Sequence, residues 1–308
     1  MSIDAVRRAA AARLPLLAAG AAALACILGG SGVVAMRVLV AETDPVTVAF
    51  LRTGLATLLL GGVALVTVRQ RIPLRDVAAM AGLGLFSFGI YQWLVAGALQ
   101  YGTAARVAIG STSMPFMALL VAALAGIEKP SPQKVGGLGL AACGVALAMW
   151  QDAAAGPGAW RGDALVLFAS LLGGAAAVFA VPYVRRYPPL VVVAVGTLPA
   201  VLMLWGGTLA TGAPAFAPAL STTGWLLVLW LGLGSATGAY FLFHWALRHT
   251  TPTLVSISIT LNPVTALLLA ACLLGEPATA GLVAGLAIVV TGIVVANLRR
   301  RPRPLAAT

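Results

Sequence analysis

Long apolar runs alternate with short polar breaks along the chain, and each run is about as long as a membrane-spanning helix. A transmembrane helix needs about 20 apolar residues, and proline, which is tolerated at helix ends, lies at or near most of the breaks. The alternation expected of barrel strands is absent. The pattern predicts an all-α integral membrane protein of ten transmembrane helices, at 14–40, 45–68, 76–99, 104–126, 132–150, 163–184, 190–210, 222–247, 252–275 and 278–298.

The apolar pattern occurs twice. Residues 108–128 read AIGSTSMPFMALLVAALAGIE, and residues 256–276, which lie 148 positions later, read SISITLNPVTALLLAACLLGE. Pro115 aligns with Pro263, and both stretches end in glutamate. Chance identity is high in so apolar a chain, but chance does not keep one register through prolines, glutamates and spaced glycines. We therefore interpret the pattern as an internal duplication.

The duplication divides the chain into two halves. The register runs without a gap from residues 84–149 to residues 232–297, with about a third of the positions identical. The predicted domains are a first five-helix repeat at 1–150, a periplasmic connector at 151–162 and a second five-helix repeat at 163–308.

Composition and charge agree with a membrane protein. The 308 residues are 61% hydrophobic and 9% charged. A net charge of +11 would suggest a nucleic-acid partner for a soluble protein, but here the basic residues form short clusters between apolar runs, so no nucleic acid is expected. With a cytoplasmic N-terminus, fifteen Lys and Arg residues fall in inside segments and only Arg161 in an outside loop. This bias predicts cytoplasmic N- and C-termini in a bacterial inner membrane.

An odd number of helices in each half predicts that the two repeats insert in opposite senses. The loops agree, because residues 100–103 are uncharged and expected outside, whereas their counterparts at 248–251 carry Arg248 and are expected inside. Inverted repeats are typical of secondary transporters, which bind their substrate between the repeats. The pattern therefore predicts a transporter of small molecules.

A set of short motifs recurs in order along the chain. The motifs are Gly30-Ser31, Arg37, Pro45 and Leu51-Arg52 near the start, Glu128 with Gly137 and Gly144 in the first repeat, and Gly275-Glu276 with Gly281, Gly285 and Gly292 in the second. Together they resemble the EamA-type drug/metabolite transporter superfamily over nearly the whole chain. The resemblance implies a central cavity walled by helices 1, 3, 4, 6, 8 and 9, with helices 5 and 10 at the periphery. Within the superfamily the overall similarity leans toward the aromatic-amino-acid exporters.

The twin prolines, Pro115 and Pro263, are the first candidates for a functional role. Each removes a backbone donor and is expected to free the carbonyl four residues earlier, at Ser111 and Ile259. Within a bilayer such a carbonyl must find a partner or face a wet cavity. The alternatives are a substrate site or hinge near mid-bilayer, and a kink that serves packing alone.

Polar residues around the second proline form another candidate set. Ser256, Thr260 and Pro263 share one helix face, and Thr112 is the counterpart of Thr260. Asn262 is the most costly of these groups to bury. The alternatives are that Ser and Thr bond back to their own helix and that Asn262 joins helices.

Helices 3 and 8 supply a third set. Gln92 and Tyr240 are repeat partners, so inverted symmetry would place them on opposite walls of one cavity, with His244 one turn beyond Tyr240 and Trp93 alongside Gln92. His244 could instead be a solvated residue near the cytoplasmic loop. Tryptophans elsewhere in the chain fit an interfacial belt.

Three arginines fall in the outer third of predicted helices. Arg37, Arg52 and Arg106 lie at the level of Glu42 and Asp44, so ion pairs at the periplasmic rim are one interpretation. The other is a basic collar that guides a substrate carboxylate along the exit path. The family resemblance places the cation of helix 1 near the cavity, which makes Arg37 the favoured member.

Several classes of chemistry lack their motifs. No carboxylate falls in mid-membrane, which favours a uniporter or exchanger, or at most proton coupling through His244. No P-loop, HExxH or GxSxG motif occurs, and three cysteines within apolar runs suggest packing, so no cofactor, metal site or enzymatic activity is expected.

Taken together, these patterns predict an inner-membrane exporter of small metabolites that works by alternating access as a monomer or homodimer among lipids. Aromatic or neutral amino acids are the favoured substrates, because the candidate site combines aromatic and uncharged polar residues. The alternatives are a multidrug or cationic-metabolite exporter of the same fold and, from another class, a membrane-embedded enzyme.

Overall fold

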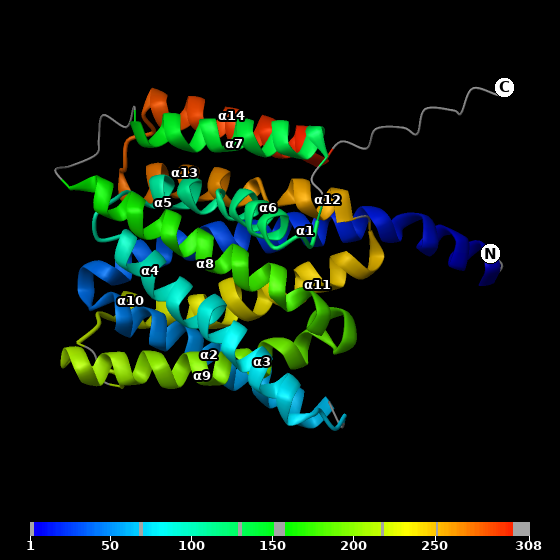
Figure 1. Ribbon diagram of the computed structural model, residues 1–308, viewed down its shortest axis with the longest axis horizontal. Coiled ribbons are helices and arrows are strands. Elements are labelled where there is room, and N and C mark those ends of the chain that lie inside the picture. Colours follow the sequence, from blue (N-terminus) through cyan, green and yellow to red (C-terminus); the bar gives the residue numbers. More distant parts are fainter. Residues whose placement is uncertain are drawn as a thin grey trace.

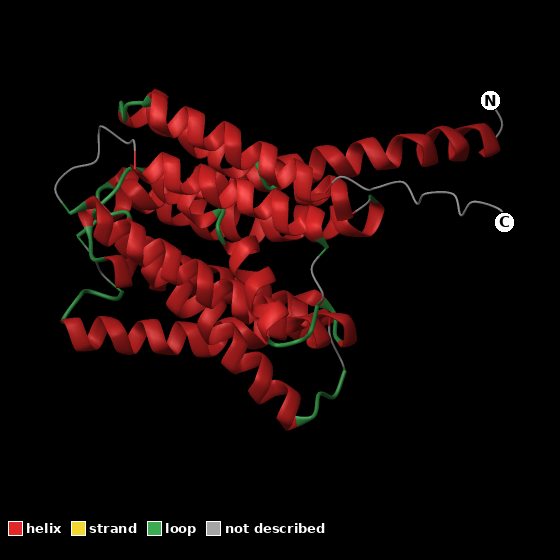
Figure 2. Ribbon diagram, turned by 45° about the horizontal axis from the view of Figure 1, so that its top comes forward, coloured by secondary structure: helices red, strands yellow, loops and turns green. Residues whose placement is uncertain are grey.

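A computed structural model of the chain describes residues 3–67, 70–128, 131–150, 158–216, 219–250 and 252–297, and in these residues every regular element is a helix (Figure 2). The α-helices are α1 (Ile3–Glu42), α2 (Pro45–Thr67), α3 (Leu74–Gly84), α4 (Tyr91–Ala98), α5 (Ala104–Ser111), α6 (Met114–Leu124), α7 (Pro132–Trp150), α8 (Ala159–Arg186), α9 (Pro189–Thr211), α10 (Thr222–Leu229), α11 (Ala239–His249), α12 (Pro252–Ser258), α13 (Leu261–Leu274) and α14 (Ala280–Asn297). Two π-helical segments, η1 (Leu85–Ile90) and η2 (Trp230–Gly238), join α3 to α4 and α10 to α11.

Within the described ranges, eight helical stretches are long and apolar enough to cross a membrane. They are Leu16–Glu42, Pro45–Thr67, Leu74–Ala98, Ala104–Leu124, Ala159–Arg186, Pro189–Thr211, Thr222–His249 and Ala280–Asn297. Neither α7 nor the α12–α13 pair is among them. The all-helical membrane fold is therefore confirmed, whereas a count of ten spans stays a prediction.

The predicted proline kinks are complete breaks. Ahead of Pro115, α5 ends at Ser111 and α6 begins at Met114, while ahead of Pro263 the helix is interrupted between α12 and α13. The turn before Pro263 is closed by a tighter bond, from the backbone N–H of Thr260 to the Ile257 carbonyl at 3.1 Å. A proline at the start of a helix costs no hydrogen bond, since that N–H has no helical partner.

One consequence predicted for Pro263 is wrong. The Ile259 carbonyl is not left open for a ligand, because the backbone N–H of Asn262 donates to it at 3.1 Å. The turn thus satisfies the carbonyl that the missing proline donor would otherwise free.

The π-helical segments occupy corresponding places in the two repeats. Residues Leu85–Ile90 of η1 align with the last six residues of η2 in the register of the duplication. A π-helical turn holds an extra residue and re-aims the side chains that follow, and such turns are frequent at functional sites. Gln92 and Tyr240, two residues beyond each segment, both lie on a cavity wall.

Helices α7 and α14 pack against each other so closely that their backbones touch (Figure 1). A Cβ atom added at Gly144 would lie 2.7 Å from the Gly285 carbonyl oxygen, and one at Gly137 would lie 2.4 Å from the Ala296 nitrogen. Glycine is therefore required at this contact. The GxxxG pair, Gly281 and Gly285, accordingly lies in a helix packed within one chain.

Two further glycine contacts are equivalent in the repeats. A Cβ atom at Gly30 of α1 would lie 2.3 Å from the Asn262 carbonyl oxygen, and one at Gly174 of α8 would lie 3.0 Å from the carbonyl oxygen of Met114. Asn262 and Met114 are repeat partners in the sequence. Each repeat thus packs its first long helix on the proline-broken helix of the other half.

Candidate functional site

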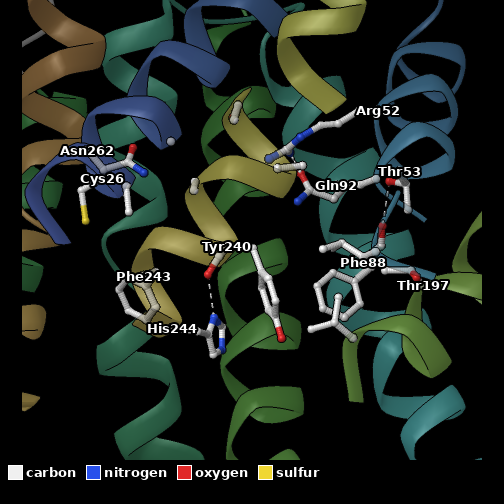
Figure 3. A pocket seen from close by; sticks show the side chains of 18 of the residues that line it. Cys26, Arg52, Thr53, Phe88, Gln92, Thr197, Tyr240, Phe243, His244 and Asn262 are labelled. Atoms are coloured by element: carbon white, nitrogen blue, oxygen red, sulfur yellow. Dashed lines mark hydrogen bonds between the residues drawn. The ribbon is translucent and has the colours of Figure 1, made fainter. Parts of the chain in front are cut away.

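A central cavity of about 340 Å³ lies between helices from both repeats (Figure 3). Its walls come from α1, α2, η1, α4, α9, η2, α11, the break between α12 and α13, and the start of α13. The family resemblance had implied helices 4 and 6 in place of 2 and 7. The polar and aromatic side chains of the lining are Cys26, Arg52, Thr53, Phe88, Gln92, Thr197, Ser235, Tyr240, Phe243, His244 and Asn262.

One wall of the cavity carries a cation. Arg52 donates a hydrogen bond from Nη1 to Oε1 of Gln92, and the same nitrogen lies 3.6 Å from the sulfur of Met36. Its Nε is buried and has no hydrogen-bond partner among the residues that the structure describes. Among the described residues, no carboxylate forms an ion pair with this guanidinium. The cavity therefore contains an uncompensated positive charge.

Away from Arg52 the lining is aromatic. The rings of Tyr240 and His244 lie with centroids 4.0 Å apart, and Phe243 and His244 meet edge to face at 5.9 Å. In the view of Figure 3, Phe88 and Phe243 lie on either side of Tyr240. These rings offer an apolar surface that would hold a flat or branched side chain.

His244 is oriented by its own helix. Its Nδ1 lies 2.9 Å from the Tyr240 carbonyl oxygen, which can only accept, so Nδ1 carries the hydrogen. In the neutral ring Nε2 is then an acceptor.

Buried hydroxyl groups along the cavity lack partners. Ser235 Oγ and Tyr240 Oη are both buried and make no hydrogen bond within the described part of the chain. An unsatisfied buried polar group is costly, and in native proteins it usually meets water or a ligand. With Arg52 Nε, three such atoms therefore belong to residues that line this cavity.

A second cavity, of about 400 Å³, adjoins the first. Thr112, Pro115 and Pro263 line it, and Asn262 and Ile259 belong to the walls of both cavities. The side chain of Asn262 packs on α1, since a Cβ atom at Gly29 would lie 2.7 Å from its Nδ2. The proline breaks and the aromatic site therefore line neighbouring cavities that share Asn262 and Ile259.

The structure divides the residues predicted for the site. Gln92, Tyr240, His244 and Asn262 lie together on the central cavity, whereas Thr112, Pro115 and Pro263 line the neighbouring one.

Two predicted residues, Trp93 and Thr260, lie away from both cavities, and a third, Ser256, is not placed. Trp93 is 42% exposed on the outside of the bundle, one residue and therefore about 100° of helix rotation from Gln92. Thr260 is buried and donates from Oγ1 to the Ile257 carbonyl at 2.8 Å. Its hydroxyl thus bonds back to its own helix, which was the alternative to a role in the site. The side chain of Ser256 lies outside the described residues.

Arg37, the favoured arginine, also lies away from the cavity. Its Nε forms an ion pair with Glu276 Oε1 at 3.0 Å. Arg106 is paired too, in two bonds to Asp163 of 2.8 and 2.7 Å. The interpretation that these arginines form ion pairs is therefore confirmed for Arg37 and Arg106. The residue that reaches the cavity is Arg52, which the sequence could not separate from the other two because all three lie at the same helical level.

The acidic partners also differ from those expected. Glu42 accepts hydrogen bonds from Ser221, and Asp44 accepts one from the Val46 N–H at 3.0 Å. Both carboxylates cap the starts of helices, where the helix dipole favours negative charge.

A model of the EamA-like transporter family matches residues 16–150 and again residues 160–298. The chain belongs to the EamA-like transporter family. The two matches follow the two halves of the duplication, and members of the family are membrane transporters of small molecules rather than enzymes.

Other comparisons give this EamA-like transporter its fold but no substrate. One solved structure, described only as "Crystal structure of protein", has a TM-score of 0.60 at 20% identity and covers 88% of this chain and 96% of its own. No curated protein sequence matches. At this identity the likeness establishes the fold alone. Among the residues described for this EamA-like transporter, no group of His, Cys, Asp and Glu could hold a metal ion.

Proposed function

We propose that the protein is a secondary transporter that exports small amphipathic metabolites, above all aromatic or neutral amino acids, across the bacterial inner membrane. The observation that carries this proposal is the lining of the central cavity. It joins an arginine and an amide to a group of aromatic rings, and among the described lining residues none has a carboxylate. Such a lining suits a molecule with a polar head and an apolar body.

The size of the cavity supports a small substrate. Its volume of about 340 Å³ is at the lower end of the range of small-molecule sites, which is roughly 300–1,000 Å³. A single amino acid is a suitable occupant, whereas a bulky drug would need the neighbouring cavity as well.

Alternating access between two inverted five-helix repeats, with both termini cytoplasmic, is the mechanism we propose. The equivalent contacts at Gly30 and Gly174 support two structurally similar repeats, and the bias of basic residues supports the orientation. In this orientation the Arg37–Glu276 ion pair would lie on the periplasmic side, where we propose that it closes the path to the cavity. Because none of the described residues that line the cavity has a carboxylate, we favour uniport or exchange over proton antiport.

The rival proposal is a carrier of cationic drugs or metabolites. Arg52 argues against it, because a cation in the same cavity would meet an uncompensated positive charge. Aromatic rings alone would offset little of that repulsion.

Transport by purified protein in liposomes tests the proposal. Vesicles loaded with unlabelled phenylalanine should accumulate labelled phenylalanine or methionine by exchange, and a cationic dye should not be carried. Imposing a pH gradient should leave the exchange rate unchanged. Transport of the dye without any amino-acid exchange would support the carrier of cationic compounds instead. Exchange that requires the pH gradient would indicate proton coupling, with His244 as the first candidate for the proton-binding group.

A further inference from the structure

We infer that Arg52 and Gln92 form a carboxylate subsite, so that the transported molecule is recognised by its carboxylate and not by an ammonium group. This inference rests on the proposed function, and it adds the chemical group that every substrate must carry. Four observations support it.

The first observation concerns the unused donors of Arg52. A guanidinium has five N–H donors in a fixed fork. The hydrogen bonds found for Arg52 all come from Nη1, and Nε is buried without a partner. An anion that accepts from two of the remaining donors would have the bidentate geometry typical of arginine and carboxylate.

The second observation is a comparison among the helix arginines. Arg37 and Arg106 each have a resident carboxylate, at 3.0 Å and 2.7 Å, although Arg37 is only partly buried. Arg52 lies on the cavity and has none among the described residues. An unpaired charge within a membrane protein is costly and tends to mark an ion or substrate path. The missing counterion is one that the substrate itself supplies.

The third observation is the nature of the partner that holds Arg52. Gln92 accepts the hydrogen bond from Nη1 through a neutral amide oxygen. An amide therefore orients the guanidinium and leaves its charge available. A glutamate at position 92 would have the same shape but would form a permanent ion pair and occupy the subsite.

The fourth observation is the location of the apolar surface. Tyr240, Phe243 and Phe88 lie on the same cavity as Arg52 but on other walls (Figure 3). A substrate whose carboxylate contacts Arg52 can therefore extend an apolar body over these rings. An ammonium group finds only neutral acceptors in the lining, such as Asn262, so it contributes little to affinity.

Analogues that lack one charged group test the inference. Exchange of labelled phenylalanine in liposomes should be inhibited by 3-phenylpropionate, which lacks the ammonium group, at concentrations similar to those of phenylalanine. Phenylalaninamide and phenethylamine, which lack the carboxylate, should be at least about tenfold weaker, as expected when a hydrogen-bonded charge is lost. Equal inhibition by the carboxylate-free analogues would overturn the subsite.

Variants of the pair assign the effect to these residues. R52Q should weaken inhibition by phenylalanine and by 3-phenylpropionate about tenfold or more, so that neither is preferred over phenylalaninamide or phenethylamine. R52K should restore part of this preference, since lysine keeps the positive charge but lacks the paired donors of the guanidinium. Q92E, which preserves shape, should lose carboxylate inhibition as strongly as R52Q. R161Q removes an arginine outside the cavity and should behave as the wild type. An unchanged preference in R52Q or Q92E would contradict the inference.

Binding to detergent-solubilised protein separates this inference from the proposed function. Calorimetric titration with 3-phenylpropionate and phenethylamine reports the subsite even if phenylalanine is not transported. Carboxylate-selective binding that is lost in Q92E, together with an absence of amino-acid exchange, would retain the subsite and reject amino acids as cargo. Binding of both ligands with equal affinity would reject the subsite. Size-exclusion chromatography of each variant excludes misfolding, and Q92E serves if R52Q does not fold.

Discussion

Glu276 and Arg37 join the two repeats at one end of the bundle. The Nε of Arg37 in α1 lies 3.0 Å from Oε1 of Glu276, just beyond α13, and the other carboxylate oxygen accepts a hydrogen bond from the Ala104 N–H at the start of α5 at 2.9 Å. One carboxylate therefore holds three helices together. In the proposed mechanism this contact must open whenever the cavity opens to the periplasm.

Replacing Glu276 with glutamine should favour the periplasm-open state. The variant keeps the shape but removes the charge that Arg37 pairs with. A cysteine introduced at Thr53 on the cavity, in a background without native cysteines, should then react faster with a membrane-impermeant thiol reagent added outside.

The repeat partner Glu128 provides the control for that experiment. It pairs with Lys134 in an exposed contact within its own half. E128Q should leave the labelling rate at Thr53→Cys unchanged. Equal rates in E276Q and the parent protein would show that the Arg37–Glu276 contact does not close the cavity.

The ion pair of buried Arg106 with partly buried Asp163 should contribute strongly to stability. Arg106 is 5% exposed and also donates to the Met149 carbonyl at 2.7 Å. R106M should lower the free energy of unfolding by about 3 kcal/mol, because it leaves the partly buried Asp163 carboxylate without its partner. Replacing both residues, as R106M/D163L, should recover most of that loss.

Thermal unfolding in detergent, followed by tryptophan fluorescence, measures these changes. K134M breaks the exposed pair with Glu128 and should cost about 0–1 kcal/mol. A cost for R106M no larger than that of K134M would contradict the structural role assigned to the Arg106–Asp163 pair.

A side chain at Gly144 should separate α7 from α14. The Cβ atom of G144L would lie 2.7 Å from the Gly285 carbonyl oxygen, so one helix must shift, at a cost of about 1–3 kcal/mol or more. The matched control is G136L in the same helix, where a Cβ atom meets nothing within 4 Å. Unfolding temperature and expression level report the difference, and equal values would show that the close contact is not required.

Pro263 should influence turnover more than assembly. P263A restores a backbone N–H that competes with the Asn262 N–H for the Ile259 carbonyl, which favours a continuous helix across the break between α12 and α13. We expect the exchange rate to fall several-fold while membrane insertion and unfolding temperature change little.

Pro182 supplies the comparison for this substitution. It lies inside α8, on neither cavity, and its side chain is exposed. P182A should leave the exchange rate unaffected. If P263A exchanges amino acids at the parental rate, the break that precedes the proline in each repeat does not act as a hinge.

The sequence alone determined the helical membrane fold, the duplication and the family. Hydrophobic length and spacing are local properties, and the repeat register needs no knowledge of contacts. It also predicted that Gln92 and Tyr240, with His244 nearby, face one cavity, because helix periodicity and repeat symmetry together restrict which faces can meet; Asn262 was a separate candidate.

Only the tertiary structure decided which arginine stays without a carboxylate. Asp163 and Glu276 pair with arginines 57 and 239 positions earlier in the chain, so hydropathy and local spacing do not reveal these partners. The π-helical turn before Gln92 and the backbone contact at Gly30 set which neighbouring side chains face inward. Charge pairing depends on distances between helices, and these are fixed by packing that no single helix encodes.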